Sequence, residues 1–155
     1  MLSQTTEYAL RALAHLAREG TDPSARTAEE TILQAEEIAS ALDVPRNYLS
    51  KILHALSREG ILASTRGPRG GFRLAAPARD IPLSRIVKVF EPQLLADEQR
   101  CIMGRTVCSD DDPCSAHEHW KGVSRSVRAF FARTTLEDLA TRGDGPTGGG
   151  GENDE

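Results

Sequence analysis

The sequence lacks any apolar run that approaches the roughly 20 residues of a membrane-spanning helix. Its N-terminus, MLSQTTEYAL, is polar and lacks the apolar segment of a secretory signal peptide. Cysteine is scarce as well: there are three, all between residues 101 and 114. An odd number argues against a disulfide framework and favours a metal or redox site. We therefore expect a cytoplasmic protein, not associated with a membrane, whose thiols stay reduced.

The net charge of −4 hides an uneven distribution of charge. Residues 143–155, GDGPTGGGGENDE, contain four acids and no base, which is typical of a disordered acidic tail. Residues 44–74, in contrast, contain six arginine or lysine side chains against one acid, Glu59. Local positive charge of this kind is typical of nucleic-acid binding.

The basic segment has the pattern of a helix followed by a hairpin. A short helix at 35–42 and a basic helix that Pro45 begins are joined by the tight turn Asp43–Val44, which indicates a helix-turn-helix. Gly60 is expected to follow the basic helix in the left-handed conformation. Strands at 61–63 and 72–74 enclose the turn sequence RGPRGG, and a short strand at 32–33 can join them.

Further helices are expected at 5–18, 83–90, 113–132 and 135–140, whereas 92–100 is expected to be irregular. The long helix carries an apolar stripe that a second copy of the chain can cover, which predicts a homodimer: Ala116, Trp120, Val123, Val127, Phe130 and Phe131. The fold class is mainly α (α+β). It combines a winged helix-turn-helix domain over 1–92, with a small antiparallel β wing, and a cysteine-bearing loop with a long C-terminal dimerisation helix over 93–142.

Residues near the start of the second helix of a helix-turn-helix face base edges in the major groove. In this sequence they are Arg46, Asn47, Tyr48, Ser50 and Lys51. Amide and hydroxyl groups can read base edges, whereas the two cations can equally contact phosphates, and Tyr48 can instead serve the core. Arg66 and Arg69 stand on the glycine-rich hairpin tip at Gly67, where arginine can enter a narrow minor groove. The alternative is that these arginines only keep the turn solvated.

The cysteines have the spacing Cys101-x6-Cys108-x5-Cys114. Three thiols on one loop suit an iron–sulfur cluster or zinc, either of which takes four ligands. His117, three residues after Cys114, is one candidate for the fourth ligand, and an external group is another. No base and orienting group stand around a cysteine in a recognisable arrangement, so we expect no enzyme and no small-molecule substrate.

Several motifs in order resemble the Rrf2 family of winged-helix regulators, which includes IscR, NsrR and RirA. The matching motifs are SQTTEYALRAL near the N-terminus, VPxxYLSKIL in the basic helix, RGPRGGF in the wing and the three downstream cysteines. The resemblance covers roughly residues 1–142. It implies a homodimeric bacterial transcription factor that binds double-stranded DNA through the wing and the second helix.

The resemblance also implies roles for single residues. Asn47, Tyr48 and Ser50 match the major-groove readers of the family, and Arg66–Gly67 match its minor-groove contact. Some members take their fourth cluster ligand from a histidine at the position of His117, and others from a carboxylate on the first helix of the partner subunit, where this sequence has Glu7. The sequence departs from the IscR pattern in its first cysteine gap, six residues instead of five, and in an insertion at 21–31.

These observations lead to two hypotheses of different classes. The first is a DNA-binding regulator that senses iron–sulfur status, redox state or nitric oxide through a cluster on the three cysteines. The cysteine spacing leaves open whether that cluster is 2Fe–2S or 4Fe–4S. The second is a winged-helix DNA-binding module that zinc stabilises and that has no sensing role.

Overall fold

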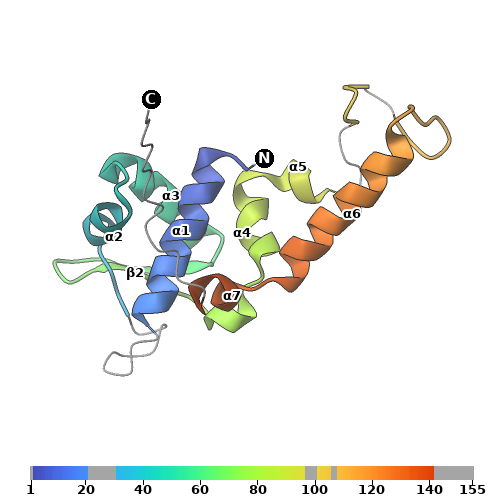
Figure 1. The fold of residues 1–155 in the computed structure, drawn as a ribbon. Helices are drawn as coiled ribbons and strands as arrows, with labels where there is room; N and C mark the ends of the chain where they lie inside the picture. The colour runs from blue at the N-terminus through green and yellow to red at the C-terminus, as the bar shows by residue number, and fades with distance from the viewer. Residues whose placement is uncertain (1, 21–30, 97–100, 106–107, 142–155) are drawn as a thin grey trace, which may run out of the picture.

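The computed structural model describes residues 2–20, 31–96, 101–105 and 108–141. In chain order (Figure 1) they form α1 (Gln4–Glu19), α2 (Ala35–Leu42), α3 (Arg46–Arg58), β1 (Leu62–Thr65), β2 (Gly71–Leu74), the 3-10 turn η1 (Ala78–Asp80), α4 (Leu83–Phe90), α5 (Pro92–Leu95), α6 (His117–Arg133) and α7 (Leu136–Thr141). Most of the insertion at 21–31 and the expected tail at 143–155 lie outside the described residues. Among the described residues, no helix is both long and apolar enough to cross a bilayer.

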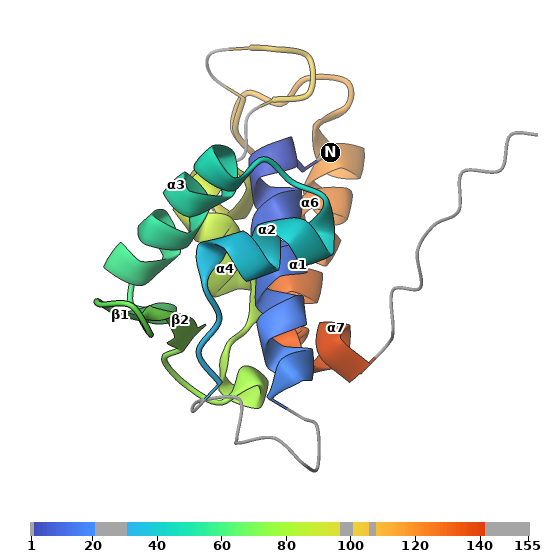
Figure 2. The ribbon, with the colours of Figure 1, turned by 90° about the vertical axis from the view of Figure 1, so that its left-hand side faces the viewer.

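Helices α2 and α3 form the predicted helix-turn-helix (Figure 2). Asp43 reverses the chain between them in the left-handed region, with φ 54°. The small side chain of Ala39, 4% exposed, allows the two helices to pack closely. Pro45 is the residue before α3 rather than its first residue, and Gly60 follows the helix at φ 66°, as predicted.

The wing is a two-stranded antiparallel sheet with a short third segment beside it. Leu33 exchanges both backbone hydrogen bonds with Phe72 of β2, at 3.0 and 2.8 Å, which confirms the predicted strand contact there. Gly71 is needed for this close approach, and Gly70 is needed for the turn at the hairpin tip. A Cβ on Gly71 would lie 2.4 Å from the carbonyl oxygen of Leu33, and one on Gly70 would lie 2.1 Å from that of Thr65.

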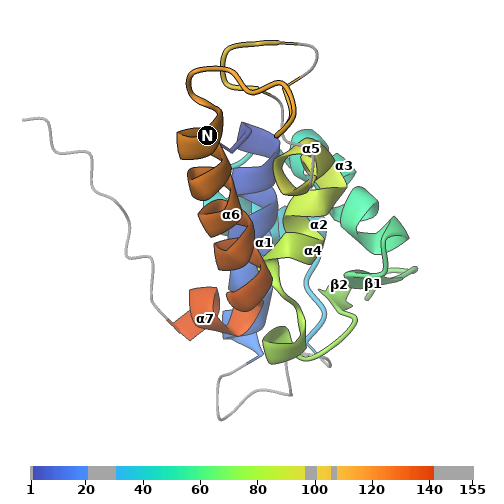
Figure 3. The same ribbon diagram turned by 90° about the vertical axis from the view of Figure 1, so that its right-hand side faces the viewer.

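Helix α1 is the centre of the core and packs against α2, α3, α4 and α7. The chain returns to this core after α6. The backbone N–H of Leu136 donates to the carbonyl of Ile81, and that of Leu83 donates to the carbonyl of Thr134, both at 2.9 Å. Figure 3 shows the resulting arrangement, with α6 packed against α4 and with α7 at the far end of α6. The C-terminal segment therefore shares a core with the winged helix.

Helix α6 begins at His117 rather than at the predicted residue 113. Residues 115–116 form a turn in which the His117 N–H donates to the carbonyl of Cys114 at 3.0 Å. The predicted apolar stripe divides into two adjacent seams. Phe131 is buried in the protein's own core, whereas Val123 and Phe130 are 53% and 54% exposed.

A buried carboxylate connects the start of α1 to the end of α4. Glu91, 9% exposed, accepts hydrogen bonds from the Ser3 N–H at 2.8 Å, the Ser3 hydroxyl at 2.9 Å and the Thr6 hydroxyl. Burial alone would raise the pKa of Glu91, but the bonds from Thr6 and Ser3 outweigh it and lower that pKa. Directly after Glu91, Pro92 starts the helical turn α5 in a segment expected to be irregular.

Glu91→Gln is expected to lower the free energy of unfolding at pH 7 by about 1–2 kcal/mol, because hydrogen bonds to a charged acceptor are stronger. The folded-state pKa is below the unfolded value, so this advantage is complete above pH 4.5 and is lost as the pH falls through the folded pKa. Urea unfolding of both proteins at pH 7 and at pH 3 measures it. Glu137→Gln, on the exposed first turn of α7, is the control. An equal effect of the two substitutions, or a difference that grows in acid, would contradict this role of Glu91.

Candidate functional site

The predicted base-reading residues lie together on the exposed side of α3. Arg46, Asn47 and Lys51 are exposed, and Ser50 is half-buried. The apolar residues of α3 face the core instead, which turns this polar face outward: Leu49, Ile52, Leu53 and Leu56. The start of α3 thus presents amide, hydroxyl and cationic groups to solvent on a helix that the core fixes from behind.

Two of these residues have protein partners. The Tyr48 hydroxyl forms a short hydrogen bond with the Thr5 hydroxyl of α1, and its ring packs edge-on against Tyr8 at 5.9 Å. Tyr48 is nevertheless 37% exposed, so it fixes α3 to α1 and still presents an edge to solvent. Arg46 pairs with Glu36 of α2 at 3.1 Å, and both side chains are more than 60% exposed. Such an exposed ion pair adds little to the stability of the fold, so Arg46 can leave Glu36 and bind a DNA phosphate instead.

The tip of the wing is a tight turn with few side chains. The Gly70 N–H donates to the carbonyl of Gly67 at 2.9 Å, and Gly67 has φ 108°. Arg66 precedes this turn and Arg69 lies within it, and both are exposed. The Gln34 amide donates to the carbonyl of Pro68 at 3.3 Å, which ties the tip to the residue before α2. The wing therefore holds two arginines at a fixed, narrow tip.

The three thiols come together on the loop before α6. Their sulfur atoms all lie within 4.8 Å of one another, and Cys101 Sγ and Cys114 Sγ are 3.5 Å apart. Figures 1 and 3 place this loop at the end of the molecule where α6 begins. Two thiolates on one tetrahedral ion are about 3.8 Å apart for metal–sulfur bonds of about 2.3 Å. The donor set fits a thiophilic metal, and its spacing matches thiolates that share one ion.

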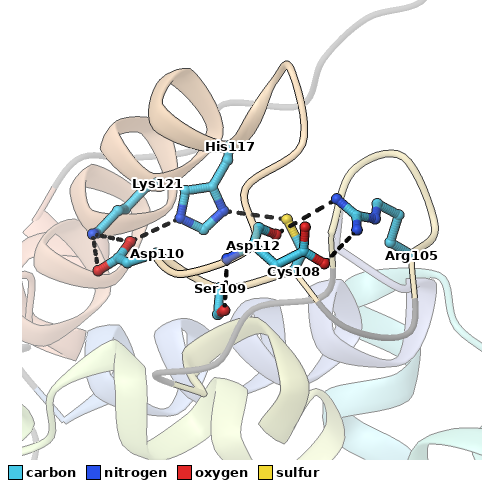
Figure 4. Close-up of polar contacts among 7 residues, drawn as sticks. All are labelled: Arg105, Cys108, Ser109, Asp110, Asp112, His117 and Lys121. Atoms are coloured by element: carbon cyan, nitrogen blue, oxygen red, sulfur yellow. Dashed lines mark hydrogen bonds and ion pairs between the residues drawn. The ribbon is translucent and has the colours of Figure 1, made fainter.

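His117, the first residue of α6, reaches this group through Cys108. Its Nδ1 atom is 3.2 Å from Cys108 Sγ, and its Nε2 atom is 2.9 Å from Asp110 Oδ1 (Figure 4). Lys121, one turn further along α6, donates to both oxygens of Asp110. The Lys121 hydrogen bond and then that of His117 lower the pKa of Asp110.

Hydrogen bonds and burial give Cys101 and Cys108 different acidities. The backbone N–H of Arg105, followed by that of Met103, lowers the pKa of Cys101 to about 7. The Cys114 N–H alone would lower the pKa of Cys108, but burial and the neighbouring thiols outweigh it and raise that pKa. Cys101 is thus the first of the two to become a thiolate, the form that binds metals.

Glu7, the other predicted candidate for a fourth ligand, is exposed on the first turn of α1. Among the described residues, the group whose ligand atoms all lie within 4.8 Å of one another holds the three thiols and includes neither Glu7 nor His117. His117 is the predicted fourth ligand that contacts a thiol within this chain, through its Nδ1 atom and Cys108 Sγ.

Comparison with known proteins identifies the family. The family model described as Rrf2, iron-dependent transcriptional regulator, matches residues 2–142. The chain belongs to the Rrf2 family. This Rrf2 protein is 34% identical over 141 residues to a protein of Aquifex aeolicus named as an HTH-type transcriptional regulator, with 90% of each chain covered. It is 29% identical over 103 residues to IscR of Pectobacterium carotovorum, covering 66% of this chain and 61% of that one.

Solved structures agree on the fold of this Rrf2 protein. CymR, the global cysteine regulator of B. subtilis, superposes with a TM-score of 0.73 at 26% identity, covering 93% of this chain and 98% of that one. IscR of T. potens gives a TM-score of 0.67 at 23% identity, over 91% and 86% of the two chains. The predicted winged-helix fold and the assignment to DNA-binding transcriptional regulators rather than enzymes are confirmed.

Sequence reasoning missed the partners of the predicted residues. The sequence analysis assigned no partner to Asp110, yet this carboxylate pairs with Lys121 and His117. The i, i+4 spacing of His117 and Lys121 was a usable signal, because it places both side chains on one face of a helix. The contact between Thr5 and Tyr48 had no such local signal, because 43 residues separate them.

Proposed function

We propose that this Rrf2-family regulator is a homodimer whose DNA binding responds to an iron–sulfur cluster on Cys101, Cys108 and Cys114. The proposal depends on the three thiols that lie close together on one loop, because cysteine thiolates are the usual ligands of iron–sulfur clusters. The similarity to IscR supports it. A bound iron–sulfur cluster would react with oxidants and nitric oxide, and it would be lost when iron is scarce.

In this proposal α3 reads base edges in the major groove with Asn47, Tyr48 and Ser50. Arg46 and Lys51 contact either the base edges or the neighbouring DNA phosphates. The wing enters the minor groove with Arg66, Gly67 and Arg69. The exposure of α3 and of the wing tip supports these roles. The exposed seam of Val123 and Phe130 supports pairing of α6 with a second copy.

The thiol loop and α3 are connected through α1. The loop follows α4 and α5, and Glu91 at the end of α4 holds the first turn of α1 through Ser3 and Thr6. The same turn of α1 carries Thr5, which bonds Tyr48 of α3. A change in loop position can therefore alter the base-reading helix through a few hydrogen bonds at the start of α1.

A second function, a zinc-stabilised DNA-binding module, is favoured by one observation. The separation of 3.5 Å between Cys101 Sγ and Cys114 Sγ is close to that of two thiolates on one tetrahedral ion. Ligands of different irons in a cluster must be spread further apart. His117 would complete four ligands around a single ion.

Anaerobic purification followed by visible spectroscopy and by iron, sulfide and zinc assays distinguishes the two functions. The cluster predicts broad visible absorption with bound iron and acid-labile sulfide, both lost in Cys108→Ser. A colourless protein with one zinc per chain would overturn the sensing proposal in favour of the zinc module. A colourless protein with neither metal would overturn both.

A further inference from the structure

His117 lies between a thiol and a carboxylate (Figure 4). Cys108 Sγ is 3.2 Å from its Nδ1 atom, and Asp110 Oδ1 is 2.9 Å from its Nε2 atom. A carboxylate oxygen can only accept a hydrogen bond, so the Nε2 atom carries the proton in this contact. The Nδ1 atom then has its lone pair free on the side of the thiol group.

Asp110 is itself held in place. Lys121 donates to both of its oxygens, at 2.5 and 2.7 Å, from one turn beyond His117 on α6. A loop carboxylate is thus clamped between two side chains of one helix face, and the His117 ring cannot turn away without breaking the contact with Asp110. The His117 side chain is only 14% exposed, whereas Asp110 and Lys121 are 67% and 38% exposed. Ion pairs with exposed groups such as Asp110 and Lys121 add little to the stability of the fold, so we expect them to act on the orientation of the His117 ring.

We propose that Asp110 and Lys121 are positioning residues that present His117 Nδ1 as the fourth ligand beside Cys101, Cys108 and Cys114. Metal-bound histidines commonly donate their other N–H to a carboxylate, which fixes the tautomer and the ring orientation. This inference rests on the proposed function, in that it requires a metal or cluster on the three cysteines. It assigns the fourth ligand to the same chain rather than to Glu7 of the partner subunit.

The bond lengths agree with this assignment. A nitrogen and a sulfur on one tetrahedral ion lie about 3.6 Å apart for the usual metal–nitrogen and metal–sulfur bonds of about 2.05 and 2.3 Å. The observed separation of Nδ1 and Cys108 Sγ is 3.2 Å, within a few tenths of an ångström of that value. These two atoms can therefore bind one metal without a large movement of the helix. His117 is not in the group formed by the three thiols, so Cys101 and Cys114 must move closer to His117 for all four to bind one ion.

The test compares metal retention by the full-length protein, Asp110→Ala and the matched control Asp111→Ala. Asp111 is the neighbouring exposed acid on the same loop, so the control makes the same change of charge. After anaerobic reconstitution, metal is removed by a competing chelator and its loss is followed by absorbance or by metal assay. Loss of an outer carboxylate typically costs 10–100-fold in affinity. Asp110→Ala is expected to show that loss, Lys121→Met a smaller one, and Asp111→Ala none.

Two further readouts separate positioning from a general effect on the loop. In the His117→Ala background, Asp110→Ala is expected to cause no additional loss, because its effect acts through His117. In the metal-free protein, nitrogen NMR of the His117 ring is expected to show the Nε2–H tautomer, and Asp110→Ala is expected to abolish that preference.

Equal retention by Asp110→Ala and Asp111→Ala in a protein that loads metal would overturn this inference alone. So would an undiminished effect of Asp110→Ala in the His117→Ala background. Failure of the parent protein to bind iron or zinc would overturn the proposed function, and this inference with it.

Discussion

Val123→Glu is expected to convert the proposed dimer into a monomer and to weaken binding to a DNA with two half-sites by at least about 100-fold. Val123 is 53% exposed on α6 and, with Phe130, forms an apolar seam that the chain leaves uncovered. In a symmetric dimer the substitution places a charge in the interface twice, and burying an unpaired charge is costly. A monomer loses the gain of binding two half-sites together, which is typically 10²–10⁴-fold.

Analytical ultracentrifugation measures the first effect and fluorescence anisotropy the second, with DNA selected from a random library by the parent protein. Ala132→Glu introduces the same charge on an exposed position nine residues along α6, on the opposite side of the helix. It should leave the dimer intact. A Val123→Glu protein that remains a dimer would show that a different surface joins the subunits.

Arg66→Ala is expected to weaken binding to the selected DNA by 10–100-fold. Arg66 stands beside Gly67 at the exposed wing tip, where a side chain can enter a minor groove. A specific arginine contact with DNA is worth about 1–3 kcal/mol, and a loss of 10–100-fold falls within these limits. Arg66→Lys keeps the charge but loses the planar guanidinium, so it should recover only part of the affinity.

Anisotropy titrations at several salt concentrations give both the affinity and its salt dependence. Arg79→Ala removes an exposed arginine from η1, which packs beside α7, and it should leave the affinity unchanged. Similar losses for Arg66→Ala and Arg79→Ala would mean that general positive charge, rather than the wing contact, accounts for the effect.

The helix-turn-helix and the wing were predictable from the sequence because their sequence signals are local. The spacing of apolar residues predicted α2 with the bounds that the structure shows. Glycine residues marked the end of α3 and the tip of the wing. The start of α6 was predicted four residues early, because Pro113 is a common helix opener and nothing in the sequence marks the turn at 115–116. The single turn α5 is too short to carry a periodic signal.

The site was predictable in its residues but not in their connections. Cysteine spacing identified the three thiols, and the structure brings their sulfurs within 4.8 Å of one another. Contacts between distant segments, such as Glu91 with Thr6 or Thr5 with Tyr48, depend on the packing of α1 against α3 and α4. No local pattern encodes such packing. The roles of the DNA-facing residues and of Glu7 remain predictions.

The central claim, that metal on the thiol loop controls DNA binding, is tested most directly by comparing the DNA affinity of loaded and metal-free protein. Protein loaded under anaerobic conditions, the same preparation after chelation, and a variant with Cys101→Ser, Cys108→Ser and Cys114→Ser are titrated with DNA selected by the loaded form. A difference of at least about 10-fold between the loaded protein and both metal-free forms is expected, which corresponds to about 1.4 kcal/mol of coupling. Equal affinities and equal selected sequences in all three would contradict the account.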